Sequence, residues 1–140
     1  MARLNPYLTF DGTCEAAFQR YKAVLGGEVV SVMRWKDMPK TGGMSTPDGW
    51  AEKVMHSELT FSGGRIMGSD APPGHRQQPA GMTVTLSVDT PEEADRLFSG
   101  LGEGGTVTMP IGETFFSKRF GMLTDQFGIP WMVVCEERPS

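Results

Sequence analysis

A histidine and a glutamate two positions apart, His56 and Glu58, are the side chains of this 140-residue sequence best suited to chemistry. Side chains alternate between the two faces of a strand, so the segment His56-Ser57-Glu58 would present both groups on one face. An imidazole beside a carboxylate could transfer protons as a general acid and base, and Tyr7 could donate a hydrogen bond to an oxyanion. The alternative is that neither group is catalytic: His56 would then be a hydrogen-bonded structural residue and Glu58 a solvated carboxylate. They are therefore catalytic candidates, and whether the chain is an enzyme stays open.

Nucleophilic catalysis and nucleotide binding have little support in the sequence. Of the two cysteines, Cys14 falls on the apolar stripe of an expected helix and Cys135 on an expected final strand. Both positions are typical of buried thiols. No Gly-x-Ser-x-Gly motif occurs, and the glycines at 102–105 follow a helix pattern, whereas a dinucleotide-binding loop follows a strand.

The composition indicates a folded protein and excludes several classes. Hydrophobic residues make up 39% and charged residues 21% of the chain, which argues against disorder. A net charge of −4 argues against nucleic acid as a partner. No run approaches the roughly 18 apolar residues that a membrane span requires, and the start of the sequence has no signal-peptide pattern. With only two cysteines, at no metal-binding spacing, the expected location is the cytoplasm.

A diverged internal repeat predicts the elements that position these residues. The order strand, helix, Gly-Gly, strand occurs twice, with Leu8–Asp11 resembling Leu86–Asp89. The first helix is expected to begin after Thr13, which is its candidate N-cap, and it carries an apolar stripe. The second is marked by Thr90 as a cap and Pro91 in the first helical position.

Three strands are expected after each helix, which gives the order βαβββ twice. The expected strands span residues 28–35, 54–61 and 65–69 in the first half and 106–110, 118–124 and 130–135 in the second. Residues 36–50 read as an inserted loop and 71–81 as a joint. The predicted fold class is therefore α+β, with module one at about 1–70 and module two at about 82–136 in a single domain of residues 1–140. The polar strand faces would meet either solvent, as is usual for amphipathic sheets, or a cleft.

Several segments resemble the PhnB-like branch of the vicinal oxygen chelate superfamily, which includes glyoxalase I, extradiol dioxygenases, and the fosfomycin and bleomycin resistance proteins. The matching segments are Asn5–Gly12, Glu15–Phe18, Gly68–Asp70, Glu113–Phe116 and Phe120–Trp131. The resemblance implies paired βαβββ modules that curve round a cleft, usually in a homodimer. Phe116-Ser117 departs from the pattern of the relatives, in which a tryptophan and a small residue are common after the first phenylalanine. The predicted pocket residues are Tyr7, Thr9, His56, Glu58, Thr83, Thr85, Phe115, Trp131 and Met132.

The same resemblance allows the metal-ligand positions of the relatives to be carried over. They fall on Asn5, Met67, Thr83 and Met132. A neutral amide, a hydroxyl and two thioethers are poor ligands for Mg, Mn, Fe or Zn, although thioethers suit Cu(I). We therefore expect no cofactor and no bound transition metal. A divalent ion held by a non-standard set drawn from His56, Glu58 and Asp70 is the alternative.

The leading hypothesis is a cytoplasmic homodimer that binds a small organic molecule in its cleft. The alternatives are a metal-dependent lyase, isomerase or dioxygenase, and a structural or interaction protein. Some PhnB-like proteins carry a demethylubiquinone methyltransferase label. A common methyltransferase site needs a strand, then a glycine-rich turn, and an acid that binds the ribose. The sequence shows no such combination, so this label has weak support.

Overall fold

The computed structural model describes residues 2–37, 46, 48–72, 74 and 78–135. The chain divides into two compact units, Met1–Gln77 and Gln78–Ser140, and the division falls within the predicted joint 71–81. Most of the inserted loop 36–50, part of the joint and residue 136 lie outside the described residues.

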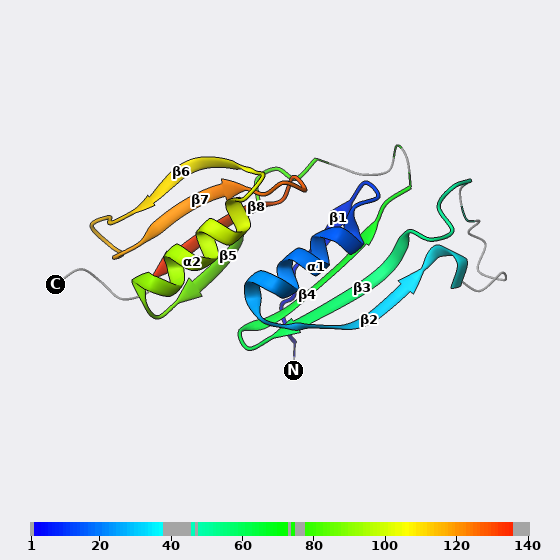
Figure 1. Cartoon of the computed structure of the whole chain (residues 1–140), viewed down its shortest axis with the longest axis horizontal. Helices are drawn as coiled ribbons and strands as arrows, with labels where there is room; N and C mark the ends of the chain where they lie inside the picture. Colours follow the sequence, from blue (N-terminus) through cyan, green and yellow to red (C-terminus); the bar gives the residue numbers. More distant parts are fainter. Residues whose placement is uncertain (1, 38–45, 47, 73, 75–77, 136–140) are drawn as a thin grey trace. The chain divides into compact units, whose positions relative to one another are not determined.

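Unit 1 is a four-stranded mixed sheet with one helix (Figure 1). Its elements are β1 (Tyr7–Phe10), α1 (Cys14–Leu25), β2 (Glu28–Arg34), the short 3₁₀ turn η1 (Trp35–Asp37), β3 (Val54–Phe61) and β4 (Gly64–Asp70). The strand order is β1-β4-β3-β2, with β1 parallel to β4 and the other pairs antiparallel.

Unit 2 repeats this design. Its elements are β5 (Val84–Val88), α2 (Pro91–Gly102), β6 (Thr106–Gly112), β7 (Phe120–Thr124) and β8 (Pro130–Cys135). The strand order is β5-β8-β7-β6, again with the outer pair β5–β8 parallel. The prediction of two βαβββ modules is confirmed. The expected bounds of β3 and β8 match the structure, whereas β6 extends two residues further than expected and β7 begins two residues later.

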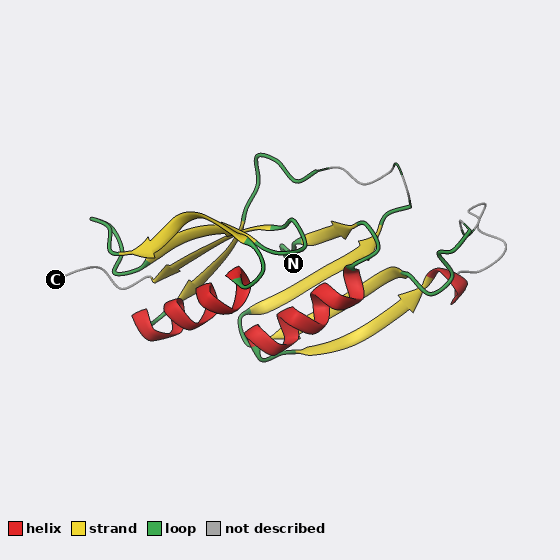
Figure 2. Cartoon of the chain, turned by 45° about the horizontal axis from the view of Figure 1, so that its top comes forward, coloured by secondary structure: helices red, strands yellow, loops and turns green. Residues whose placement is uncertain are grey.

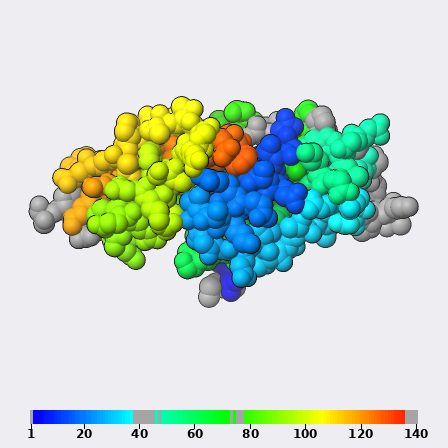
Figure 3. Space-filling model, in the orientation of Figure 1, coloured from blue at the N-terminus to red at the C-terminus, as the bar shows by residue number. Residues whose placement is uncertain are grey.

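In both units the helix covers one face of the sheet (Figure 2). In unit 1 the alternate residues Leu8 and Phe10 of β1 and Leu59 of β3 are buried with Phe18 and Tyr21 of α1. Burial of such side chains stabilises a fold by roughly 1.5–3 kcal/mol each. The opposite sides of both helices are exposed to solvent, as the space-filling view shows for α1 in blue and α2 in yellow-green (Figure 3). Because the helix of each unit packs on one face of its sheet, the other face is not covered by that helix. This other face is called the helix-free face.

The two helices begin by different means. Thr90 caps α2 as expected, because its Oγ1 accepts a hydrogen bond from the backbone N–H of Glu93 at 3.2 Å. Thr13 precedes α1, but its side chain makes no capping hydrogen bond. The carboxylate of Asp70, at the end of β4, takes that role and accepts a hydrogen bond from the N–H of Cys14 at 2.8 Å.

The buried Asp70 carboxylate joins three elements. Its Oδ1 binds the start of α1, and its Oδ2 accepts a hydrogen bond from the N–H of Val54, the first residue of β3, at 3.0 Å. Its backbone carbonyl accepts a hydrogen bond from the indole N–H of Trp35 at 3.3 Å. Unit 2 also contains a buried aspartate, Asp125, which organises the turn between β7 and β8.

Replacing Asp70 by alanine is predicted to lower the free energy of unfolding by about 2–4 kcal/mol, because two buried N–H groups lose their acceptors. Urea denaturation followed by circular dichroism measures this change. Asp89→Ala is the matched control: Asp89 is exposed just after β5, so its replacement should cost less than about 0.5 kcal/mol. Equal stability of the Asp70→Ala and Asp89→Ala variants would contradict the bridging role.

Candidate functional site

The helix-free face of unit 1 brings together four of the predicted pocket residues, Tyr7, Thr9, His56 and Glu58. The neighbours of Tyr7 and Thr9 along β1 are buried against the helix, so these two side chains point the other way. On β4, Met67 pairs with Tyr7 on one side and with Glu58 on the other. Tyr7, Met67 and Glu58 therefore form one row across three strands. These placements fit the predicted pocket, which stays a prediction because they do not show a ligand.

Tyr7 and His56 are in contact on this face. The Tyr7 Oη lies 3.4 Å from His56 Nδ1, and the ring centroids are 5.8 Å apart. Tyr7 is 48% exposed, so about half of this residue is open to solvent. The pair can offer both a hydrogen-bond donor and an acceptor, depending on the imidazole tautomer.

Glu58 is paired with an arginine that the sequence analysis did not single out. Arg65 Nη1 donates to Glu58 Oε1 at 2.9 Å. The tight turn at 62–63 sets the register that pairs Thr60 with Arg65, which places Arg65 diagonally opposite Glu58. Counting back from that turn would have revealed this pair. Part of the carboxylate of Glu58, a candidate for general acid–base catalysis, is thus engaged in an ion pair on this face.

Unit 2 places Thr85 and Met132 side by side on its own helix-free face. They are register partners on β5 and β8, and Thr85 Oγ1 donates to Met132 Sδ at 3.8 Å. Thr83 lies exposed one residue before β5 begins. Phe115 is 96% exposed in the segment between β6 and β7, where its ring contacts that of Phe116. The predicted pocket residues Thr83 and Phe115 therefore do not belong to the Thr85–Met132 pair.

The prediction that Trp131 lines a pocket is wrong. Trp131 is 0% exposed and lies on the opposite face of β8 from Met132, with the core residues Val133 and Cys135. Its indole N–H donates to Asp125 Oδ2 at 2.8 Å, which satisfies the polar group that burial would otherwise leave unpaired. Trp131 is therefore a core residue of unit 2.

Among the described residues, histidine, cysteine and carboxylate side chains do not assemble a metal site on either face. Within the described parts of the chain, no three side chains of the His, Cys, Asp and Glu types come together as ligands. The alternative set of His56, Glu58 and Asp70 is not assembled, because Asp70 is buried on the helix side of its sheet and holds two backbone N–H groups. Asn5 and Thr83 precede β1 and β5, so the strand partners of Met67 and Met132 are Tyr7 and Thr85.

A hollow of about 250 Å³ in unit 1 is lined by charged groups that have hydrogen-bond partners within the unit. Glu15 forms two hydrogen bonds with the guanidinium of Arg34, the shorter of 2.7 Å, and Lys53 Nζ donates to the carbonyl of Gly12. The hydrogen bonds from Arg34 are the main reason that the pKa of Glu15 lies below its usual value. These contacts fasten α1 to the end of β2 and the start of β3, which is a structural role.

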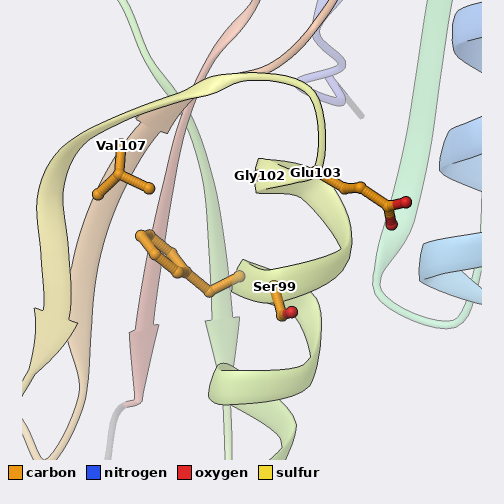
Figure 4. Close-up of a pocket in the computed structure, with 5 residues that line it drawn as sticks. Ser99, Gly102, Glu103 and Val107 are labelled. Atoms are coloured by element: carbon orange, nitrogen blue, oxygen red, sulfur yellow. The ribbon is translucent and has the colours of Figure 1, made fainter.

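A second hollow, of about 380 Å³, lies beside α2 and β6 in unit 2 (Figure 4). It is lined by Phe98, Ser99, Gly102, Glu103 and Val107. Figure 4 shows the Glu103 carboxylate directed away from Val107. Because polar groups do not converge on it, this hollow lacks the usual character of a binding site.

The cysteines are placed as core residues, as expected. Both side chains are 0% exposed. Burial raises the pKa of the Cys14 thiol far above its usual value, and the negative charges of Asp70 and Glu15 raise it further. A thiol that stays protonated is a poor nucleophile.

The two βαβββ units give the chain the α+β fold of glyoxalase/bleomycin-resistance-like proteins. The chain belongs to the family described as 3-demethylubiquinone-9 3-methyltransferase, whose sequence profile matches residues 2–134. It is 35% identical to Protein YjdN of Escherichia coli (strain K12), over 98% of both chains. Within the described residues, no helix is both long enough and apolar enough to cross a membrane.

Solved structures agree with this assignment. Protein PA1353 from Pseudomonas aeruginosa is 40% identical with a TM-score of 0.87, and the match covers 97% of this chain and 98% of that one. A putative 3-demethylubiquinone-9 3-methyltransferase, PhnB protein, from Bacillus cereus is 27% identical with a TM-score of 0.77, over 96% and 99% of the two chains. A glyoxylase/bleomycin resistance protein/dioxygenase domain from Frankia sp. EAN1pec is 16% identical with a TM-score of 0.65, over 98% of both chains, and shares the fold.

The native protein is predicted not to react with Ellman's reagent at pH 8, because both thiols are buried. Two equivalents of thiol should react after unfolding in guanidinium chloride. Fast reaction of one thiol in the native state, at unchanged circular dichroism, would contradict the core assignment of Cys14 and Cys135.

Proposed function

We propose that this chain binds a small organic molecule on the helix-free face of unit 1, without a hard divalent metal ion. The observation that carries the proposal is the distribution of methionine. The sequence has ten methionines, yet none of those in the described residues belongs to the buried core. Aliphatic, aromatic, alanine and cysteine side chains form that core instead.

Methionine placed on a surface favours adaptable binding. Its side chain is unbranched and polarizable, so a surface that contains it can repack around ligands of different shape. On unit 1, Met67 lies beside Tyr7, and Met33 pairs with His56 across β2 and β3. The thioethers supply an apolar contact, while the Tyr7–His56 pair supplies hydrogen bonds that orient the ligand.

The donor set argues against a hard metal ion as the centre of this site. The family resemblance implies that Met67 occupies a position that carries a ligand in metal-using relatives, and thioethers bind Mg, Mn, Fe and Zn poorly. The competing function is a lyase, isomerase or dioxygenase with a non-standard ligand set. Elemental analysis of the purified protein separates the two, since one tight equivalent of Zn, Fe or Mn per chain would overturn the metal-free proposal.

The methyltransferase activity in the family's description is not proposed here. The glycines at 102–105 connect the end of α2 to β6, so they do not form a phosphate-binding turn after a strand. Both sheets described are four-stranded and mixed, unlike the parallel doubly wound sheet that such a turn belongs to.

Replacing Met67 by glutamine is predicted to weaken binding of the probe 8-anilinonaphthalene-1-sulfonate at least tenfold, because a polar amide replaces the apolar centre of the row. Fluorescence titration measures the dissociation constant. Met82→Gln is the control, since Met82 is 81% exposed and lies outside the strands.

His56→Phe tests the polar part of the same face. It should weaken binding of this sulfonate probe severalfold, while leaving the far-ultraviolet circular dichroism unchanged. If Met67→Gln and His56→Phe both titrate like the unaltered protein, the proposed face is not the binding site.

We also propose that the chain forms a homodimer. β2 is an edge strand of its sheet and exposes Val30 and Val32, and exposed apolar edge strands favour association. Light scattering coupled to size-exclusion chromatography should give twice the chain mass of 15.3 kDa. A monomer mass at 100 μM protein would refute this proposal.

A further inference from the structure

Three methionines form one row across adjacent strands of unit 2. Met109 on β6 is the register partner of Met122 on β7, and Met122 is the register partner of Met132 on β8. Paired residues share a face of the sheet, so all three side chains lie on the helix-free face. Thr85 on β5 ends the row beside Met132.

The spacing of the row allows the three sulfur atoms to meet. Directly opposed residues have Cβ atoms about 4.5–5.5 Å apart, and a methionine side chain has three rotatable bonds beyond its Cα. Met122 is the middle member, so both neighbours are within reach of it. Met109 is 45% exposed, and Met122 and Met132 are half-buried, so a small ion has access to the row.

Packing does not explain why these residues are methionine. Unit 1 has the same row in the same register, and there it reads Tyr7, Met67, Glu58 and Ser31. Only Met67 and Met132 agree, whereas Glu58 and Ser31 are replaced by Met122 and Met109. The core of the described residues is built without methionine, so the thioether sulfur atoms of these residues lie outside it.

We propose that Met109, Met122 and Met132 form a binding site for a soft monovalent metal ion, Cu(I) or its analogue Ag(I). Thioethers are neutral, soft donors that select Cu(I), and three of them can surround an ion that accepts low coordination numbers. The donors carry no proton, so binding displaces none, and no redox step is involved. This site is independent of the organic ligand proposed for unit 1.

The test is a competition for Cu(I) with the coloured chelator bicinchoninate, on untagged protein, without oxygen and with ascorbate to keep the copper reduced. The unaltered protein should withdraw one equivalent of Cu(I). Met122→Leu keeps the volume and removes the central sulfur, so it should weaken Cu(I) binding at least tenfold. Met132→Leu should act in the same direction.

Met82→Leu is the matched control, because it removes an exposed thioether of the same unit that lies outside the row; its affinity should equal that of the unaltered protein. Circular dichroism checks that each variant is folded. The proposal is overturned if the unaltered protein takes no Cu(I) from the chelator, or if a folded Met122→Leu variant binds as tightly as the unaltered protein. The second outcome would assign the copper to other groups, such as Cys14 or Cys135.

Discussion

The buried carboxylate of Asp70 is the contact on which the arrangement of unit 1 depends. It satisfies the N–H groups at the start of α1 and the start of β3, and its backbone carbonyl holds the indole of Trp35. A buried carboxylate is stable only when hydrogen bonds replace its hydration, and these contacts provide them. Because Asp70 points to the helix side at the end of β4, the alternate residues Ser69 and Met67 must point to the other side. The contact that positions the helix therefore also fixes which side chains the helix-free face presents.

Strand alternation explains both what could be predicted from the sequence and one of its errors. The alternation puts Leu8 and Phe10 in the core and Tyr7 and Thr9 on the opposite face. The same rule forbids Trp131 and Met132 from lining one face of β8, although both were expected in the pocket. Applied consistently, the period of two would have assigned Trp131 to the core.

Other contacts could not be predicted, because they join residues that are distant in the sequence. Asp70 and Cys14 are 56 positions apart, and no local pattern shows that Thr13 leaves the start of α1 without a side-chain cap. The Glu58–Arg65 ion pair spans only seven positions and follows from the turn between β3 and β4. It could have been predicted by choosing the turn first and counting the register from it. Local geometry is thus accessible from the sequence, whereas the buried polar contacts between elements require the structure.

The two units differ most where the fold constrains them least. Their sheets have the same strand order and each contains a buried aspartate, but the aspartates occupy different places and bind different groups. On the helix-free faces, the row Tyr7, Met67, Glu58, Ser31 corresponds to Thr85, Met132, Met122, Met109. Core substitutions commonly cost several kcal/mol, while substitutions on an uncovered face usually cost less than about 0.5 kcal/mol. The rows can therefore differ between the two units while the cores keep the same fold. Unit 1 carries Glu58 and Ser31 where unit 2 carries the thioethers of Met122 and Met109. This divergence is why an organic ligand is assigned to one face and a soft metal ion to the other.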